Sequence, residues 1–339
     1  MNEILLEDLE DIAKRSENYC ASFKGKVFLI TGATGLIGSL LARSLYKMNE
    51  KYGLSLQVIA MVRNKEKAKA MFEDLDVKIV TSVEEVNGVV NYVVHCAAPT
   101  QSQFFIEKPV ETMDAIILGT KELLDLAKKK QVEKFLYISS MEAYGTIEKE
   151  QLVKEDDAGR VALNKTRSSY PLAKRTAELY TYCYSDEYYV NVSIVRLAMC
   201  FGAGLGKDDH RVHKSFCEDA LNGRDIVVKS SGETIVNFVY SADAVIALLM
   251  LLVKGKNKET YNVAGDNNGL TIYNMAKYVA ELGGVEVRKE LPQGVSAFAP
   301  ENKMKLDVSK IRGIGWQPKY DLKGSLDRLM GYLKHERLD

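Results

Sequence analysis

The stretch VFLITGATGLIG, residues 27–38, joins an apolar run to a turn rich in glycine. A helical pattern of apolar residues follows at 40–46. Strand, glycine turn and helix in this order are typical of a dinucleotide site, because the glycines permit a tight turn, a close approach to the pyrophosphate and close packing of the helix on the strand. An ordinary turn in an unrelated α/β protein is the alternative. The expected cofactor contacts in this stretch are Gly32, Ala33, Thr34, Gly35, Leu36, Ile37 and Gly38.

Apolar runs alternate with helical patterns through the first 200 residues. The runs that we expect to form strands lie at 27–31, 57–62, 77–80, 92–95, 135–139 and 193–197. The expected helices lie at 38–51, 65–74, 109–130 and 171–186. Because the runs are too apolar for a sheet with one wet face, the pattern predicts an α/β fold with a doubly wound parallel sheet, of the Rossmann type, covered by helices on both faces.

The pattern changes after residue 202. A charged loop at 206–213 is followed by expected helices at 212–221, 243–253 and 271–282 and by short strands at 226–228 and 234–240. We divide the chain into an N-terminal helical extension at 1–24, a dinucleotide-binding domain at 25–200 and a smaller lobe at 201–339. For the leading helix, a cap on the sheet domain, a dimer contact and a frayed end all remain open.

Composition and charge exclude several classes of function. The chain has 46 basic and 46 acidic residues, so nothing indicates a nucleic-acid or anionic-membrane partner. The five cysteines form no CxxC pair and no cluster with histidine, which favours a reduced protein without structural zinc. The start MNEILLEDLEDIAKR is acidic and amphipathic, unlike a secretory signal, and the longest apolar stretch, 244–253, is too short for a membrane span. We expect a cytoplasmic protein.

Tyr170 and Lys174 lie four residues apart in the segment SSYPLAKRTAE. Tyr170 directly precedes the expected helix at 171–186, and Lys174 lies in its first turn. This spacing places both side chains on one helix face, where the ammonium can stabilise the ionised phenol and yield a general base near neutral pH. The alternative is a pair of solvent-facing side chains.

Five segments in a fixed order resemble the extended short-chain dehydrogenase/reductase family, in its branch of nucleotide-sugar epimerases, dehydratases and decarboxylases. They are TGATGLIG at 31–38, VVHCAAPT at 93–100, YISSMEAYG at 137–145, YPLAK at 170–174 and VRLAMCFGAG at 195–204. The resemblance implies an NAD(P)-dependent enzyme that oxidises a nucleotide-linked sugar at carbon 4, a C-terminal lobe that binds substrate and interleaves with the sheet domain, and a homodimer formed through the helices at 109–130 and 171–186.

The same resemblance assigns roles to individual residues. Tyr170 is the expected base, Lys174 holds the cofactor ribose and lowers the pKa of the tyrosine, and Ser140 hydrogen-bonds the reacting oxygen. The remaining cofactor contacts that it implies are Ala97, Ala98, Pro99, Ser139 and Arg196, together with Tyr170 and Lys174.

Two neighbouring residues bear on the type of reaction. Glu142 occupies the position of a carboxylate that sugar 4,6-dehydratases use as a base beside the ketone, and that UDP-glucuronate decarboxylases also have; an exposed loop glutamate is the alternative. Met141 stands where many 4,6-dehydratases have a proton-donating aspartate, and a thioether cannot donate a proton. We therefore rank decarboxylase-like or dehydratase-like chemistry above plain epimerisation.

Three apolar residues depart from the family pattern. Val236 replaces an arginine that grips substrate phosphate or carboxylate, and Met199 and Ile116 replace asparagines. Apolar side chains cannot make those contacts. The substrate is then either a nucleotide sugar in a shifted pose or a different small carbonyl or polyol. The cations that could supply the missing contacts are Arg211, Arg224, Lys207 and Lys214.

Cofactor choice depends on the end of the second strand, MVRNKEK, where Arg63 and Asn64 stand in place of a carboxylate. An arginine can pair with a 2′-phosphate, so we lean slightly to NADP over NAD. His210 and His213 have no compact ligand set around them, and we expect no metal site. Two alternatives remain for the whole chain: an NADPH-dependent keto-sugar or carbonyl reductase, and a cofactor-binding regulatory protein without catalysis.

Overall fold

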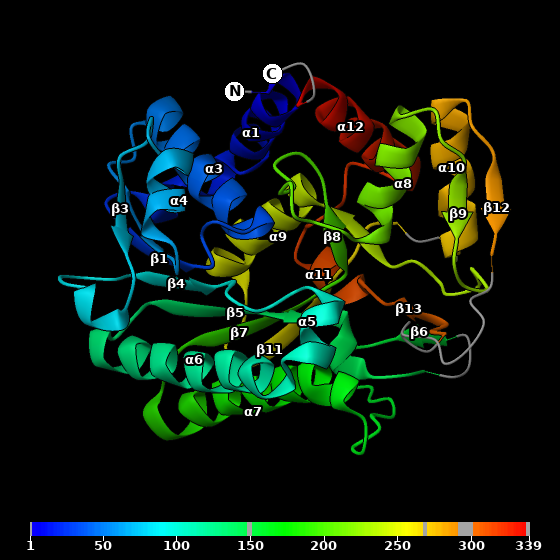
Figure 1. The fold of residues 1–339 in the computed structure, drawn as a ribbon. Coiled ribbons are helices and arrows are strands. Elements are labelled where there is room, and N and C mark those ends of the chain that lie inside the picture. Colours follow the sequence, from blue (N-terminus) through cyan, green and yellow to red (C-terminus); the bar gives the residue numbers. More distant parts are fainter. Residues whose placement is uncertain (1, 148–150, 267–269, 291–300, 337–339) are drawn as a thin grey trace.

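A seven-stranded, all-parallel sheet forms the centre of the molecule in the computed structural model, which describes residues 2–147, 151–266, 270–290 and 301–336 (Figure 1). The strand order is β11-β7-β5-β4-β1-β2-β3, so the order reverses between β1 and β4. The strands are β1 (Val27–Thr31), β2 (Gln57–Met61), β3 (Val77–Val80), β4 (Tyr92–His95), β5 (Lys134–Ser140), β7 (Val192–Leu197) and β11 (Glu259–Val263). The predicted doubly wound parallel sheet is confirmed.

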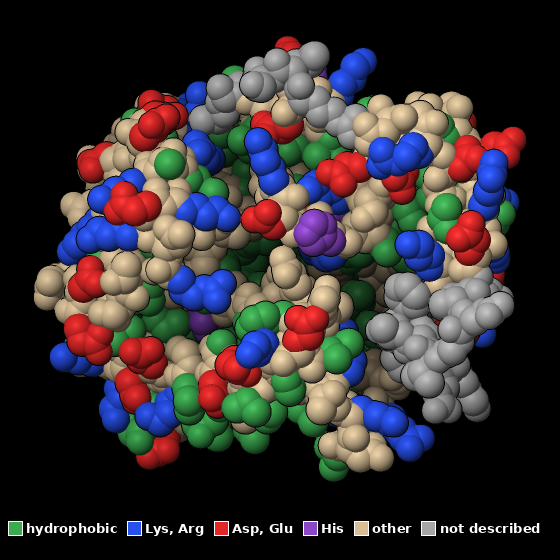
Figure 2. Space-filling view, viewed as in Figure 1, with side chains coloured by type: hydrophobic (Ala, Val, Ile, Leu, Met, Phe, Trp, Pro, Cys, Tyr) green, Lys and Arg blue, Asp and Glu red, His purple; other side chains and the backbone are tan. Residues whose placement is uncertain are grey.

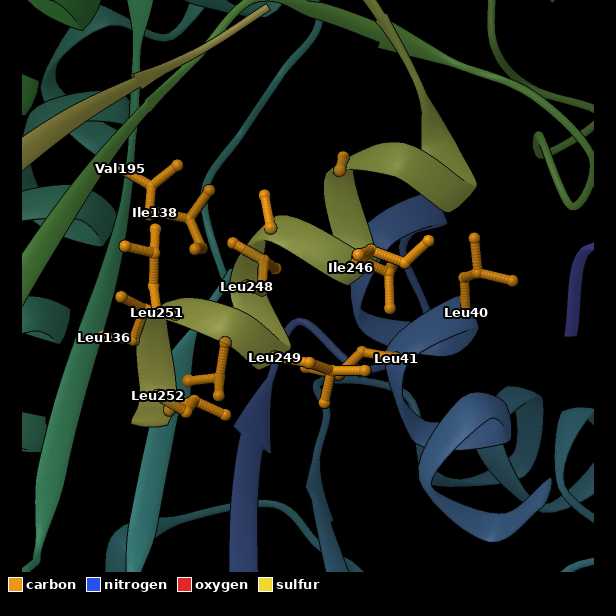
Figure 3. Close-up of a cluster of buried hydrophobic side chains, with 14 of the residues drawn as sticks. Leu40, Leu41, Leu136, Ile138, Val195, Ile246, Leu248, Leu249, Leu251 and Leu252 are labelled. Carbon is orange, nitrogen blue, oxygen red and sulfur yellow. The ribbon is translucent and has the colours of Figure 1, made fainter. Parts of the chain in front are cut away.

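Helices cover both faces of the sheet. On one face lie α6 (Pro109–Lys130) and α7 (Ser169–Tyr188), and on the other lie α3 (Leu36–Tyr52) and α9 (Ser241–Lys254), with α1 (Glu3–Arg15) packed outside them (Figure 1). Figure 3 shows why α9 is apolar on all sides: its leucines contact the β5 and β7 side chains on one side and Leu40 and Leu41 of α3 on the other. A helix that is buried all round has no polar face to keep.

A second group of elements lies beyond the carboxyl ends of the sheet strands. Helices α8 (Val212–Leu221), α10 (Ile272–Gly283) and α12 (Leu322–His335) pack on one another and enclose a separate apolar cluster. The short parallel pairs β8–β10, β9–β12 and β6–β13 complete it. The elements not yet given are α2 (Cys20–Phe23), α4 (Lys65–Met71), α5 (Ser102–Glu107), α11 (Ser309–Gly313), β6 (Gln151–Val153), β8 (Met199–Phe201), β9 (Ile226–Val228), β10 (Phe238–Tyr240), β12 (Val287–Lys289) and β13 (Met304–Leu306).

The structure differs from the sequence-based elements in several places. The seventh strand, β11, pairs with β7 although it follows β7 by more than 60 residues, so the chain returns to the sheet after it has begun the C-terminal elements. The helix expected at 65–74 ends at Met71, and the strand expected at 234–240 is reduced to Phe238–Tyr240. Short turns of 3₁₀ helix that the sequence did not indicate, η3 (Met141–Tyr144) and η4 (Thr166–Ser168), carry residues of the site described below.

The N-terminal helix α1 is tied to the rest of the fold by two buried carboxylates. Asp8 accepts hydrogen bonds from the Tyr240 hydroxyl and from the Arg328 guanidinium, each at 2.7 Å. Arg15 Nη1 donates to Oδ1 of Asp243, which is fully buried, at 2.6 Å. Since α1 contacts α3, α9 and α12, it connects the helical layer of the sheet to the C-terminal elements.

Replacing Asp8 by alanine is expected to lower the free energy of unfolding by about 3 kcal/mol, because it leaves the buried Tyr240 hydroxyl without its acceptor and takes from Arg328 its buried carboxylate partner, leaving the exposed Glu7. Thermal and urea unfolding followed by circular dichroism measure this loss. Glu7→Ala is the matched control, since Glu7 is an exposed partner of the same arginine and is worth less than about 1 kcal/mol. Equal losses in the two variants would show that the buried pair does not anchor α1.

Candidate active site

The glycine turn lies where the strand order reverses, at the carboxyl ends of β1 and β4. Gly32 has φ +62°, and a Cβ added there would come within 2.9 Å of the backbone of Ala97, in the loop after β4. A Cβ at Gly38 would overlap with the carbonyl oxygen of Gly32. Both glycines are therefore required by close backbone contacts: Gly32 brings the two loops together and Gly38 lets α3 start tightly against the turn.

The N-terminus of α3 is suited to an anion. Its N-cap is Gly35, which offers no side-chain hydrogen bond, so the amides of the first helical turn have no side-chain acceptor. Those amides and the helix dipole attract a negatively charged group. Figure 2 shows that this face of the molecule is hollowed near its centre, in the region where α3 begins and above α5 in Figure 1. The turn, the uncapped helix and the hollow together fit a dinucleotide with its pyrophosphate at residues 32–38.

A buried polar network supports the two loops from below. Thr31 Oγ1 lies 2.7 Å from His95 Nδ1, and it accepts a hydrogen bond from the Ala97 amide at 3.2 Å. The second ring nitrogen of His95 lies 3.1 Å from the hydroxyl oxygen of Thr120 in α6. Burial lowers the pKa of His95 to about 3, so the ring is neutral and serves to link β1, β4 and α6.

Tyr170 and Lys174 project from the first turns of α7 toward the end of β5. Tyr170 is buried, the Ser140 side chain is close enough to lower the pKa of its hydroxyl, and its ring stacks on Phe105 of α5 with centroids 4.2 Å apart. The Lys174 ammonium donates to the Ile138 carbonyl at 2.7 Å and lies 6.0 Å from the centre of the Tyr170 ring. The structure thus brings together Tyr170, Lys174 and Ser140, three of the four residues expected to be catalytic.

The electrostatics of this pair are set by burial. Burial raises the pKa of Tyr170 well above its ordinary value, and the Glu142 carboxylate raises it further, whereas Ser140 and the Arg167 and Arg211 charges lower it. Burial also lowers the pKa of Lys174 to about 8. At neutral pH the phenol is therefore un-ionised, whereas Lys174, with a pKa of about 8, is mostly protonated.

Glu142, the fourth expected catalytic residue, lies on η3, directly after β5. Its Oε2 accepts a hydrogen bond from Arg167 Nη2 at 2.8 Å. The backbone of η3 is held by Arg175 of α7, which donates to the carbonyls of Ala143, Tyr144 and Gly159. Glu142 is therefore close enough to influence the pKa of Tyr170, and it lies on a turn that α7 itself fixes.

Residues of the C-terminal elements approach the same site. Arg211, at the N-cap of α8, pairs with Asp209 at 2.5 Å and is close enough to Tyr170 to influence its pKa. Gln101, in the loop after β4, donates to the carbonyl of Asp208 at 3.2 Å, so the loop before α8 meets the sheet domain there. Among the four cations that the sequence offered, Arg224 lies at the other end of α8 with Asp219, and Lys214 is buried and donates to the Lys207 carbonyl.

The apolar replacements are packed as core residues. Ile116 of α6 is buried in the cluster beneath α7, and Val236 is buried in the C-terminal cluster, where Met199 of β8 also packs. Val236 leaves no cation at its position, so Arg211 and Arg167 are the guanidinium groups that influence Tyr170 among the described residues.

The other expected cofactor residues are placed in two ways. Ala97, Ala98 and Pro99 form the loop that meets Gly32, and Arg63 and Asn64 follow β2, where Arg63 is exposed and Asn64 caps α4. By contrast, Arg196 pairs with Glu178 of α7 at 2.7 Å, and the Ser139 hydroxyl donates to the same glutamate. In this structure the side chains of Arg196 and Ser139 thus link β5 and β7 to α7 beneath the site.

Sequence reasoning missed Arg167 and Phe105, which complete the surroundings of Tyr170. The Arg167 guanidinium lies over the Phe105 ring, 4.9 Å from its centre, and Phe105 stacks on Tyr170. A signal was present for Arg167, which stands three residues before the tyrosine in RSSY. No comparable signal marks Phe105, because α5 is a helix of only six residues.

Within residues 2–147, 151–266, 270–290 and 301–336, no group of three or more His, Cys, Asp or Glu side chains could hold a metal ion. The helices in those ranges include none with the length and apolarity that crossing a membrane requires.

Comparisons with known proteins agree with this geometry. Residues 28–264 match the family model described as NAD dependent epimerase/dehydratase family. UDP-glucuronic acid decarboxylase 6 of Arabidopsis thaliana is 28% identical over 304 residues, which cover 88% of this chain and 86% of that protein. The human dTDP-D-glucose 4,6-dehydratase is 27% identical over 328 residues, or 91% of this chain and 90% of the dehydratase. The crystal structure of UDP-glucose 4-epimerase from Thermotoga maritima has the same fold, with a TM-score of 0.77 at 24% identity, covering 92% of this chain and all of that one.

Proposed function

The chain belongs to the NAD dependent epimerase/dehydratase family, and from this premise we propose that it is an enzyme that modifies a nucleotide-linked sugar by transient oxidation at carbon 4. The observation that carries the proposal is the meeting of Tyr170, Ser140 and Glu142 at the carboxyl end of β5, beside the glycine turn. Parallel sheets of this topology bind their ligands at this edge. The two relatives described above are named for UDP-glucuronic acid and dTDP-D-glucose, which agrees with a nucleotide sugar as the substrate.

Each part of the site has its own role in the proposed reaction. Residues 32–38 and the N-terminus of α3 hold the pyrophosphate, and Lys174 holds the nearby ribose. When bound, the oxidised nicotinamide brings a positive charge and accepts a hydride from the sugar. Tyr170 takes the proton of the sugar hydroxyl, and Ser140, whose side chain lowers the pKa of the phenol, orients the same oxygen. Glu142 then acts on the keto sugar, whose neighbouring carbon is acidic.

Decarboxylase-like or dehydratase-like chemistry ranks above epimerisation because Glu142 stands at the position of the carboxylate in those enzymes and its charge influences the phenol. Loss of carbon dioxide from a carboxylate placed beta to a ketone needs no proton donor at position 141, and Met141 offers none. We therefore place decarboxylation first, dehydration second and epimerisation third. An NADPH-dependent reduction of a keto sugar or another carbonyl is the second candidate, and the observation that favours it is the exposed Arg63 after β2, suited to a 2′-phosphate.

Mass spectrometry of products tests the proposal. The enzyme is incubated with UDP-, dTDP-, CDP- and GDP-sugars, including uronic acids, and the cofactor released from the purified protein is identified. The expected result is a modified sugar without net consumption of cofactor. Stoichiometric oxidation of NADPH would support the reductase instead, and an unchanged panel with either cofactor would contradict both.

We propose that the protein is a cytoplasmic homodimer. All five cysteines are free, as expected in a reducing compartment. The helices α6 and α7 pack on each other, and their outer surface exposes the apolar side chains of Val110, Leu118 and Leu179. Two copies of this pair would bury those side chains in a four-helix contact. Sedimentation velocity is expected to give the mass of two chains, and a monomer at micromolar concentration would contradict the proposal.

A further inference from the structure

Glu142 creates an electrostatic difficulty at the proposed site. Tyr170 must lose a proton, yet a carboxylate close by raises the pKa of the phenol. An enzyme that keeps both a phenol base and a carboxylate near one substrate therefore needs a positive charge that offsets the carboxylate. Val236, where the sequence resemblance expects an arginine, is buried and apolar and cannot supply that charge.

The polar and charged groups around Tyr170 come from five parts of the fold. They are Ser140 and Tyr137 of β5, Glu142 of η3, Arg167 of η4, Lys174 of α7 itself and Arg211 before α8. Arg211 is engaged on both carboxylate oxygens of Asp209. Lys174 is turned to the Ile138 carbonyl. Arg167 is the cation in this set that contacts Glu142 directly, at 2.8 Å.

The position of Arg167 is defined by its neighbours. It precedes α7 on η4, its guanidinium lies over Phe105, and Phe105 stacks on the ring of Tyr170. The pair is partly exposed, at 23% for Arg167 and 35% for Glu142, so the carboxylate stays accessible to a substrate while the arginine holds it. An arginine that stacks and pairs at once loses little further freedom on holding its partner.

We propose that Arg167 is a positioning residue for Glu142: it holds the carboxylate at the edge of the site and offsets its charge at Tyr170, so that one pocket can contain both a phenol base and a carboxylate. This inference rests on the proposed function. It assigns Arg167 a role through Glu142 and none in cofactor binding.

The role is tested by the pH dependence of cofactor reduction in single turnovers of the holoenzyme. Arg167→Ala is expected to move the rising limb to higher pH, because the carboxylate then acts on Tyr170 without its counter-charge, and to lower kcat roughly 10–100-fold with little change in KM, as expected for a misplaced catalytic group. Arg167→Lys, which keeps the charge, is expected to recover part of the loss. Arg288→Ala is the matched control, since Arg288, on β12, forms an ion pair with Asp225 at the molecular surface.

A double-variant comparison separates positioning from a direct role. In a Glu142→Gln background, Arg167→Ala is expected to shift the pH profile as before, because the guanidinium acts on Tyr170 with or without the carboxylate, but to cause no further loss of kcat, because no carboxylate remains to be positioned. NAD affinity by equilibrium dialysis and the melting temperature are expected to stay at wild-type values in Arg167→Ala; if that variant does not fold, Arg167→Gln takes its place in both arms. An unshifted profile in an active Arg167→Ala, or the same fold loss of kcat in both backgrounds, overturns the inference. A wild type that turns over no nucleotide sugar counts against the proposed function instead.

Discussion

Replacing Tyr170 by phenylalanine is expected to reduce turnover roughly 10²–10⁴-fold, the contribution of a well-placed general base. The substitution removes only the hydroxyl, which lies within reach of Ser140. The ring remains, and its stacking on Phe105 remains with it. Since the glycine turn and the start of α3 are untouched, the affinity for the dinucleotide is expected to stay within about twofold of wild type.

Steady-state kinetics and cofactor titration measure the two quantities on the same preparation. Tyr184→Phe is the matched control: it removes a hydroxyl from the same helix, where Tyr184 donates to Asp125 at 2.6 Å, away from β5. Full activity in Tyr170→Phe would remove the phenol from the mechanism. Loss of cofactor binding together with activity would mean that the hydroxyl supports the fold of the site and not its chemistry.

Replacing Glu142 by glutamine is expected to separate the two halves of the reaction. The first oxidation continues, at equal or lower optimal pH, because the carboxylate that raises the pKa of Tyr170 is gone. The later steps on the keto sugar slow roughly 10²–10⁴-fold, since an amide can neither remove the proton beside the ketone, as dehydration requires, nor deliver a proton to the enolate that loss of carbon dioxide leaves. Reduced cofactor and keto sugar are then expected to accumulate on the enzyme.

Rapid mixing with detection of nicotinamide absorbance follows the accumulation, and mass spectrometry identifies the trapped sugar. Glutamine keeps the size of the side chain and can still accept a hydrogen bond from Arg167, so the turn η3 is expected to stay in place. Final product at the wild-type rate would make Glu142 a bystander. Failure to form any reduced cofactor would place Glu142 in the first step.

The parts of this site that the sequence predicts are those with local signals. The glycine turn is read from spacing within eight residues, and Tyr170 and Lys174 from the spacing of one helical turn. The sheet strands near these motifs are short apolar runs, and six of them are where the sequence predicts. These signals need no knowledge of what packs against them.

The parts that the sequence does not predict depend on contacts between distant segments. Strand β11, ETYNV, is a short mixed run whose place beside β7 is set by the sheet and not by its own pattern. The role of Arg167 depends on its contacts with Glu142, 25 residues earlier in the chain, and with the ring of Phe105. Arg196 and Ser139, expected at the cofactor, use their side chains on Glu178, which spacing alone could not show.

The most direct test of the account follows a single hydrogen. The nucleotide sugar that turns over is prepared with deuterium at carbon 4 and mixed with the Glu142→Gln holoenzyme, and the cofactor is then released and weighed by mass spectrometry. If Tyr170 removes the hydroxyl proton while the hydride leaves the same carbon, the reduced nicotinamide carries one deuterium. Reduced cofactor without deuterium would contradict oxidation at carbon 4. Product formation by the wild-type enzyme without any transfer of deuterium from carbon 4 to the cofactor would contradict it as well.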